Sequence, residues 1–238
     1  MNKYKILKDQ YVEVIGKKLY RIQALKDFNG VKSGDIGGYI EKESNLSQSG
    51  NAWVCGNAWV CGNAWVCGNA RVCGNAQVCG NAQVYGDAQV YDYARVYDYA
   101  RVCGDAQVCG NARVCGDAWV SDYAWVSDYA WVHDNARVCG DARVCGNARV
   151  CGDAWVCGTR HYLNLGPIGS RYGYTTIYRN KNRKAMVICG CFSGNLDDFE
   201  RAVRKTHNGT KYEAEYMALI QLARLREKEW LENERDST

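Results

Sequence analysis

The chain repeats itself every six residues from Asn51 to Gly158. The first unit reads Asn-Ala-Trp-Val-Cys-Gly, and there are 18 units of this kind without an insertion or a deletion. A short, fixed period is the sequence signature of a repeat architecture, in which a unit buries its apolar side only against its neighbours. This stretch therefore limits the possible fold more than any local preference elsewhere in the 238 residues.

Each unit has a strand half and a bend half. Ala52 and Val54 are two positions apart, so on an extended strand they point to one side and Trp53 points to the other. The slot between Ala and Val holds only Trp, Arg or Gln, which suits an outer surface. Each unit ends on Gly or Asp followed by Asn, Asp or Tyr, and Gly, Asp and Asn tolerate a left-handed backbone. We therefore expect short strands with Ala and Val inside and a sharp bend after each.

Three such strands would close a triangular coil of 18 residues. The run Val54-Cys-Gly-Asn-Ala58-Trp resembles the pattern of hexapeptide-repeat proteins, which is an aliphatic residue, three free positions, a small residue and one free position. The resemblance implies a mainly β fold, a left-handed parallel β-helix, whose winding is an exception to the right-handed crossover preference. The 18 units would make six coils, and the prism would be about 30 Å long at about 4.8 Å per coil.

The chain has 14 Cys, of which 12 occupy the slot after Val. Stacked coils would place Cys55 above Cys73 and Cys61 above Cys79. We expect free thiols, because Tyr, Ser and His take the same slot elsewhere and obligate bridges would not allow that exchange. A spacing of six also differs from the two to four residues typical of zinc ligands. The pattern thus favours a reducing, cytoplasmic compartment and no metal or other cofactor.

The net charge is +4, but its distribution is uneven. The repeat carries seven Arg against ten Asp, which gives −3, so both ends of the chain are basic. This offers no continuous track for duplex nucleic acid. The charged N-terminal residues do not resemble a signal peptide, and no later stretch is apolar enough for us to expect a membrane partner.

We expect three parts: an N-terminal hairpin cap over 1–33, the β-helix over 34–158 and a capping domain over 159–238. Alternating residues in 11–15 and 19–23 predict a β-hairpin that covers one open end. The small-x-aliphatic pattern already begins at Gly38 and Ser44, so we interpret 31–50 as an imperfect first coil, with two extra residues near Gln48. The β-helix would then have about six to seven coils.

Beyond the repeat, the pattern predicts a small ββαα domain docked on the other end of the prism. Residues 174–178 and 185–189 alternate as two strands around a turn at 180–183. Asn195 precedes two acids, as an N-cap does, and a helix follows to about Thr206. A last helix spans about 211–232, and its charged far end should fray.

Within the prism, residues 18 apart should stack, so Trp, Arg and Gln form mixed columns on all three walls. Two interpretations stay open: Arg–Trp ladders that stabilise the coil, or an aromatic and basic binding surface. Asp replaces Gly at five corners, at 92, 98, 122, 128 and 134. These acids fit either a left-handed bend or a ligand or subunit contact.

The stretch Gly166-Pro-Ile-Gly-Ser-Arg171 is the best candidate for a binding site. Its glycines let backbone N–H groups approach an anion, Ser170 can donate a hydrogen bond, and Arg171 can fork onto a phosphate or carboxylate. An end-capping turn is the alternative interpretation. The predicted ligand-binding set, with aromatic and basic residues that could join in space, is Gly166, Gly169, Ser170, Arg171, Tyr172, Tyr174, Lys205 and His207.

As a whole the chain resembles an uncharacterised group of hexapeptide-repeat proteins from gut bacteria and their phages. The resemblance rests on the Asn-Ala-x-Val units, on Gly166-Pro-Ile-Gly-Ser-Arg and on Gly190-Cys-Phe-Ser-Gly-x-Leu-Asp-x-Phe199. It implies no established activity. We expect a non-enzymatic binding protein, a homo-oligomer with a trimer favoured, that holds a small anionic, nucleotide-like signalling ligand. A phage protein of this type would counter a host defence.

Two other functions stay open. The first is a structural scaffold that binds a host or virion protein. The second is an acyltransferase, because many left-handed β-helix proteins are acyltransferases with a His as general base. His133 is the only His in the repeat, and no loop leaves the coils to shape an acceptor pocket. We therefore expect no catalytic residue there.

Overall fold

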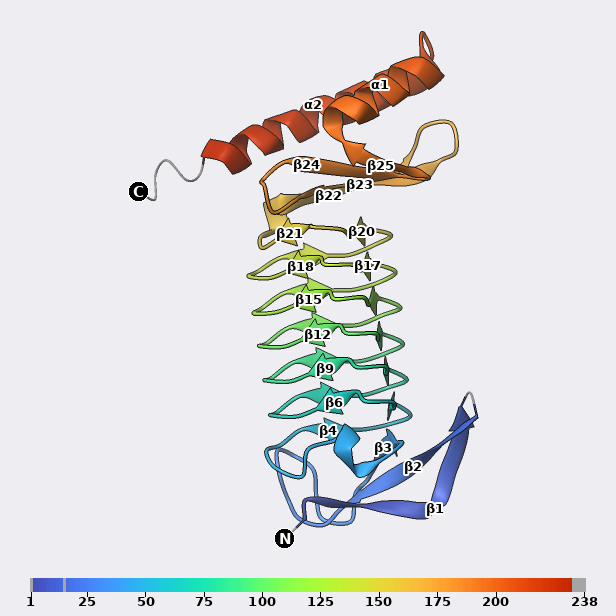
Figure 1. The fold of residues 1–238 in the computed structure, drawn as a ribbon, viewed down its shortest axis with the longest axis vertical. Coiled ribbons are helices and arrows are strands. Elements are labelled where there is room, and N and C mark those ends of the chain that lie inside the picture. The colour runs from blue at the N-terminus through green and yellow to red at the C-terminus, as the bar shows by residue number, and fades with distance from the viewer. Residues whose placement is uncertain (1, 15, 233–238) are drawn as a thin grey trace.

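The computed structural model describes residues 2–14 and 16–232. A three-sided column of stacked coils fills the middle of the molecule, with a β-hairpin at the N-terminal end and a sheet with two helices at the other (Figure 1). The structure confirms a mainly β fold built on a parallel β-solenoid of 18-residue coils. The hand of the winding stays a prediction from the resemblance, as do the three domain ranges. Within the described residues, no helix is long and apolar enough to cross a membrane.

The column has three walls, each a parallel sheet of two-residue strands in register with the strand one coil away. The first wall consists of β4 (Trp53–Val54), β7 (Arg71–Val72), β10 (Gln89–Val90), β13 (Gln107–Val108), β16 (Trp125–Val126) and β19 (Arg143–Val144). The second consists of β5 (Trp59–Val60), β8 (Gln77–Val78), β11 (Arg95–Val96), β14 (Arg113–Val114), β17 (Trp131–Val132) and β20 (Arg149–Val150). The third consists of β6 (Trp65–Val66), β9 (Gln83–Val84), β12 (Arg101–Val102), β15 (Trp119–Val120), β18 (Arg137–Val138) and β21 (Trp155–Val156).

The core of the column is made of Ala and Val, as the alternation predicts. Val108 and Ala106 are both 0% exposed, and the equivalent residues of the other units are buried as well. Each buried valine contributes roughly 1.5–3 kcal/mol by leaving water. Backbone bonds between coils, such as the one of 2.9 Å from Gln107 N to Ala124 O, satisfy the buried amides.

The N-terminal cap extends the second wall. Strands β1 (Tyr4–Val14) and β2 (Lys17–Ala24) form the predicted hairpin, and Ile15 lies outside the described residues. Strand β3 (Ile36–Ile40) joins β2 to the solenoid by pairing in parallel with β5. Its Ile40 lies beside Val60, which is a step of 20 residues, so the structure confirms a first coil with two extra residues. The short helix η1 (Glu43–Asn45) lies in the same coil.

Trp53 departs from the prediction that every variable slot faces outward. It is 3% exposed, because the rings of Tyr4 and Phe28 pack edge-on against it at 6.5 and 5.4 Å. The buried ammonium of Lys3 closes the same end by donating 2.7 Å to Ala52 O. Burial, with Lys26 nearby, lowers the pKa of Lys3 to about 8. The cap thus covers both the end coil and its unpaired carbonyl group.

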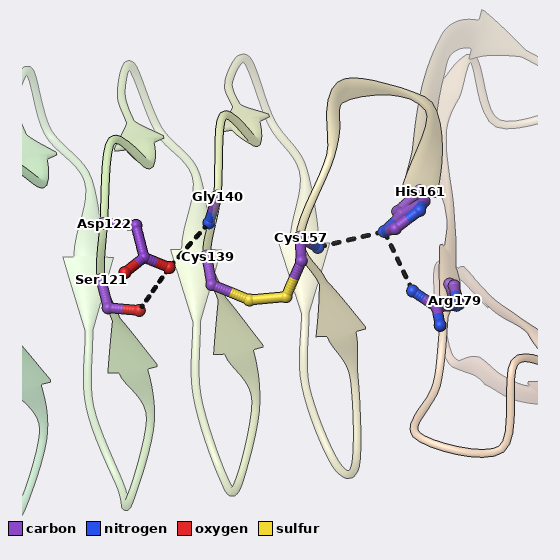
Figure 2. Close-up of a disulfide and its surroundings, with 7 residues drawn as sticks. All are labelled: Ser121, Asp122, Cys139, Gly140, Cys157, His161 and Arg179. Atoms are coloured by element: carbon purple, nitrogen blue, oxygen red, sulfur yellow. Dashed lines mark hydrogen bonds between the residues drawn. A yellow bond between two sulfur atoms is a disulfide. The ribbon is translucent and has the colours of Figure 1, made fainter. Parts of the chain in front are cut away.

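The corner aspartates have a structural role. All five have a left-handed backbone, with φ between 58° and 60°. Each carboxylate also accepts a hydrogen bond from the N–H of the glycine one coil later, for example Gly140 N to Asp122 Oδ2 at 3.0 Å (Figure 2). These contacts fit the bend interpretation, and each acid joins two coils.

The expectation that all cysteines are free is wrong for two pairs. Cys55 is bonded to Cys73, one coil away. Cys139 is likewise bonded to Cys157 in the next coil (Figure 2). Stacking brings the Cα atoms to 4.6 and 4.2 Å, so the same slot in adjacent coils can be bridged. The other ten cysteines are free thiols. Exchange of Cys for Tyr, Ser or His in other coils therefore does not exclude a local bridge.

The C-terminal part has two strands more than predicted. The antiparallel sheet runs β22 (Tyr162–Ile168), β23 (Gly173–Arg179), β24 (Ala185–Cys189) and β25 (Phe192–Asn195), after the short helix η2 (Thr159–His161). The predicted helices are present as α1 (Leu196–His207) and α2 (Lys211–Glu232), and Asn195 caps α1 by accepting from Asp198 N at 2.9 Å. The sheet lies between the helices and the last coil (Figure 1).

The far end of α2 is anchored, contrary to the prediction that it frays. Trp230 is buried and donates from Nε1 to Arg160 O at 3.0 Å. The guanidinium of Arg160 forms a two-point pair with the Glu229 carboxylate at 2.7 Å. The buried Trp230 therefore anchors the end of α2, although most side chains at this end are charged.

Candidate functional site

A cavity of about 290 Å³ opens in the C-terminal part, between the turn after β22, the end of β24 and helix α1. Its walls are mostly apolar and its polar groups come from that turn and from the end of α1. The lining residues are Ser170, Arg171, Gly173, Cys189, Gly190, Cys191, Phe192, Phe199, Ala202, Val203, Thr206, His207 and Tyr216.

The turn between β22 and β23 presents Ser170 and Arg171 to the cavity. Tyr172 N donates to Gly169 O at 3.1 Å, which closes a four-residue turn. Gly169 has φ 69°, and a Cβ there would collide with the Tyr216 ring, so only glycine fits. Its N–H donates to Glu215 Oε2 at 2.8 Å. The backbone amide that the sequence suggested for an anion is thus already bound to a carboxylate.

The floor of the cavity is a cluster of aromatic and sulfur groups. Phe199 and Tyr216 meet edge-on at 5.6 Å, and the His207 ring lies over Tyr216 at 5.5 Å. The Cys189 thiol lies 3.8 Å from the Tyr216 hydroxyl. Burial, and then the contact with Cys189, raises the pKa of Tyr216 to about 12, so this phenol stays neutral. The floor can therefore stack a planar ring but offers no negative charge.

Of the eight predicted residues, the structure brings Ser170, Arg171 and His207 together at the cavity. The side chain of Arg171 is exposed and makes no hydrogen bond or ion pair with another described residue. The other predicted residues do not line the cavity: Gly166 packs against the backbone of β23, Tyr172, Tyr174 and Lys205 face solvent, and Gly169 lies beneath Tyr216.

Sequence reasoning missed the apolar floor. Phe199 and Tyr216 belong to two different helices, and Cys189 ends a strand, so no spacing rule connects them. The run from Gly190 to Phe199 was the available signal, because it joins the strand end to the first helix.

A second, polar cavity of about 220 Å³ lies on a corner and wall of the solenoid. Tyr93, Asn111 and Tyr129 stack along the corner, and both tyrosines are more than half exposed. Beside them on the second wall lie Arg95 and Arg113, followed by Trp131. This arrangement fits the aromatic and basic surface that the sequence left open.

Other arginines of the walls stack on tryptophans and fit the ladder interpretation. Arg137 lies 5.5 Å from the ring of Trp119 and 5.7 Å from that of Trp155, one coil on either side. Arg143 over Trp125 and Arg149 over Trp131 repeat the contact on the other two walls. The two arrangements meet at Trp131, which lines the polar cavity and also carries Arg149.

One group in the described part of the chain has spacing compatible with a metal ion. Ligand atoms of His133, Asp134 and Cys151 lie within 4.8 Å of one another. The Asp134 carboxylate already contacts His133 Nδ1 at 3.2 Å and accepts from Gly152 N at 3.1 Å. That leaves one nitrogen and one sulfur, fewer than the three or four protein ligands of a zinc site.

Known proteins match this chain in the solenoid. The family described as the YdcK beta solenoid repeat matches residues 64–80, 76–92, 106–122, 136–152 and 142–158. These segments of the solenoid are similar to that repeat. A relative named "Uncharacterized acetyltransferase YdcK", from Escherichia coli (strain K12), is 41% identical over 61 residues, which is 23% of this chain. The match spans 19% of that relative's length.

Proposed function

We propose that this protein is a non-enzymatic binding protein whose C-terminal cavity takes up a small anionic, nucleotide-like ligand. The apolar floor of Phe199 and Tyr216 suits one face of a planar ring. Arg171 and Ser170 at the rim suit a phosphate or carboxylate group. A volume of about 290 Å³ fits a ligand no larger than a single nucleotide.

The observation that carries the proposal is the position of Arg171. Its guanidinium stands at the rim of an apolar cavity without a hydrogen bond or ion pair to another described residue. Surface arginines elsewhere in the C-terminal part are paired, such as Arg160 with Glu229 and Arg224 with Glu200. A guanidinium without a partner, next to an aromatic surface, can bind the anionic group of a ligand while the ligand's ring stacks on that surface.

Isothermal titration with a panel of nucleoside monophosphates and cyclic nucleotides tests this function. We expect heat with at least one of them, and Arg171→Gln should weaken binding by about tenfold or more, since a charged hydrogen bond contributes roughly 1.5–3 kcal/mol. Arg201→Gln, on the outer side of α1, is the matched control and should bind as the parent does. No heat with any member of the panel would contradict the proposal.

The cellular setting follows from the resemblance rather than from the cavity. A phage-encoded protein of this type would work in the host cytoplasm and sequester a signalling ligand to counter host defence. The exposed Trp65, Trp125 and Trp155 would supply apolar area for a homotrimer packed through the walls. Sedimentation analysis of the parent against a Trp125→Arg variant tests the oligomer, and a monomeric parent would contradict it.

Two other functions have their own tests. The name of the YdcK relative favours an acyltransferase. Turnover of acetyl-CoA that is lost in His133→Ala would support an enzyme and replace the binding proposal. A scaffold would instead retain one stoichiometric protein partner from a host lysate, through its walls, in a way that Arg171→Gln leaves unchanged.

A further inference from the structure

The only histidine of the repeat lies in a column of side chains that ends under the C-terminal cap. Tyr97, Cys115, His133 and Cys151 occupy the slot after Val in four successive coils. Above Cys151 lies the buried ring of Tyr178, from β23 of the cap. The histidine and the cysteine are thus held one above the other by the pairing of β17 with β20.

The contacts within this column form a chain from carboxylate to thiol. Asp134 Oδ2 lies 3.2 Å from His133 Nδ1, and a ring nitrogen of His133 lies within 4.8 Å of Cys151 Sγ. The second ring nitrogen, Nε2, is buried and has no hydrogen-bond partner among the described residues. The Tyr178 hydroxyl lies 3.5 Å from Cys151 Sγ on the opposite side.

Asp134 and His133 are themselves held in place. Gly152 N donates to Asp134 Oδ2 at 3.1 Å, and the Trp131 ring lies against the His133 ring at 4.5 Å. Arg149 stacks on that Trp131, on the same wall. The carboxylate and the indole therefore fix the orientation of the imidazole, as in triads in which a third group positions the base.

The charges around the thiol favour its ionised form. Against the effect of burial, the contacts with His133 and Tyr178 lower the pKa of Cys151. The contact with Cys151 and then the Asp134 carboxylate raise the pKa of His133 above its ordinary range. Each group thus stabilises the charge of the other, which is the environment of reactive cysteines.

We propose that Cys151 is a modification site, a reactive thiol that is oxidised by small hydroperoxides with His133 as its base and Asp134 as the positioning residue. The imidazole takes the thiol proton, and the thiolate sulfur attacks the terminal peroxide oxygen. A sulfur–oxygen bond forms as the oxygen–oxygen bond breaks. The leaving hydroxide or alkoxide receives the proton back from His133, so that the products are the sulfenic acid and water or an alcohol.

The half-buried position of Cys151 decides the class of oxidant. The thiol lies between His133 and the ring of Tyr178, and it lines neither of the two cavities described above. A peroxide can reach such a sulfur, whereas a bulky acyl donor would need room beside it. The site lies on the column, separate from the cavity at Arg171, and it does not depend on the proposed binding function.

The repeat supplies an internal control for the experiment. Cys67 occupies the same slot and is also half-buried, but no histidine precedes it by one coil and burial raises its pKa. The full chain, treated with EDTA, is exposed to substoichiometric hydrogen peroxide with a sulfenic-acid trap, and labelled peptides are quantified by mass spectrometry. We expect Cys151 to be labelled about tenfold or more faster than Cys67, because the thiolate is the nucleophile.

Two variants separate the base from mere packing. His133→Ser uses a residue that this slot already holds at Ser121 and Ser127, so the coil should still fold. It should slow Cys151 labelling about tenfold and move the alkylation of Cys151 by iodoacetamide to higher pH, while Asp134→Asn should have a smaller effect in the same direction. Equal labelling of Cys151 and Cys67, or a His133→Ser rate and pH profile like the parent's, would overturn the proposal. If zinc blocked the labelling of Cys151 and EDTA restored it, the proposal would be overturned in favour of a metal site.

Discussion

The carboxylate of Asp128 accepts a hydrogen bond of 2.8 Å from the backbone N–H of Gly146, one coil later in the same corner. Gly110 precedes Asp128 by one coil, and its own N–H donates to Asp92. In the columns of left-handed corner residues, no aspartate stands directly above another. From Asp92 to Gly146 acid and glycine alternate, and each carboxylate accepts a hydrogen bond from the open amide of the glycine in the next coil.

Altering this alternation should destabilise the solenoid. Asp128→Gly keeps the left-handed backbone and removes the hydrogen bond, so we expect a loss of roughly 0.5–1.5 kcal/mol. Gly110→Asp should cost more, because a Cβ at Gly110 would lie 2.8 Å from Asp128 N and the new acid would stand between two others. Urea unfolding measures both. A Gly110→Asp variant as stable as the parent would contradict the packing argument.

The Ala and Val interior should be sensitive in both directions. Val108→Ala leaves a cavity and should lower the free energy of unfolding by roughly 2–3 kcal/mol. Ala106→Val, on the same strand side, should also destabilise by roughly 1–3 kcal/mol because the interior has no room for two more methyl groups. Gln107→Ala, between them on the outer wall, is the control, and thermal unfolding should place it close to the parent.

The two tryptophans of the first coils should behave differently. Trp53→Ala should lower the free energy of unfolding by roughly 3–5 kcal/mol, since Trp53 is 3% exposed under the N-terminal cap. Trp65→Ala, at 46% exposed, should change it far less, within roughly 1 kcal/mol. Denaturant titration followed by circular dichroism compares them. Equal losses would show that the cap does not bury Trp53 in solution.

The junction between the last coil and the C-terminal sheet should weaken at low pH. His161 Nδ1 accepts from Cys157 N at 3.1 Å and faces Arg179 Nη1 at 3.2 Å (Figure 2), so the ring must be neutral at this nitrogen. Burial, and then Arg179, lower the pKa of His161 from its ordinary 6.5, whereas Asp141 and Glu229 oppose the shift. The unfolded chain therefore binds the proton more readily than the folded one.

The stability that depends on His161 is complete above its unfolded pKa and is lost as the pH falls below 6.5 through the folded pKa. Melting temperatures at about pH 7.5 and about pH 5.5 measure this loss. A His161→Gln variant should have a smaller difference between the two temperatures than the parent. The same difference in His161→Gln and the parent would exclude this role of His161.

The six-residue period predicted the coils because the pattern is local and repeated. The assignment of Ala52 and Val54 to the interior and Trp53 to the surface applies to the equivalent positions of every unit, so 18 units support the same inference. The two helices could also be predicted from the sequence, because the N-cap at Asn195 and the buried stripe of α2 are local features. The burial of Trp53 was not, because Phe28 and Tyr4 reach it from another part of the chain.

The candidate site was predicted only in part. Ser170 and Arg171 stand in a glycine-bounded turn that the sequence displays directly. The stacking floor depends on how α1 and α2 cross the sheet, which brings Phe199 and Tyr216 together. The sequence analysis expects no catalytic residue at His133, and it does not predict that His133 lies beside Cys151, although stacking places residues 18 apart next to each other.

The sequence by itself determined the coil, its period, its interior and the left-handed corners, because each depends on a side-chain pattern that recurs within six residues. Only the tertiary structure decided which outer residues are covered, which thiols meet and where a cavity opens. Those properties depend on contacts between segments far apart in the chain. These contacts lie at the two ends of the repeat, where other segments must cover the end coil and pair its open backbone groups.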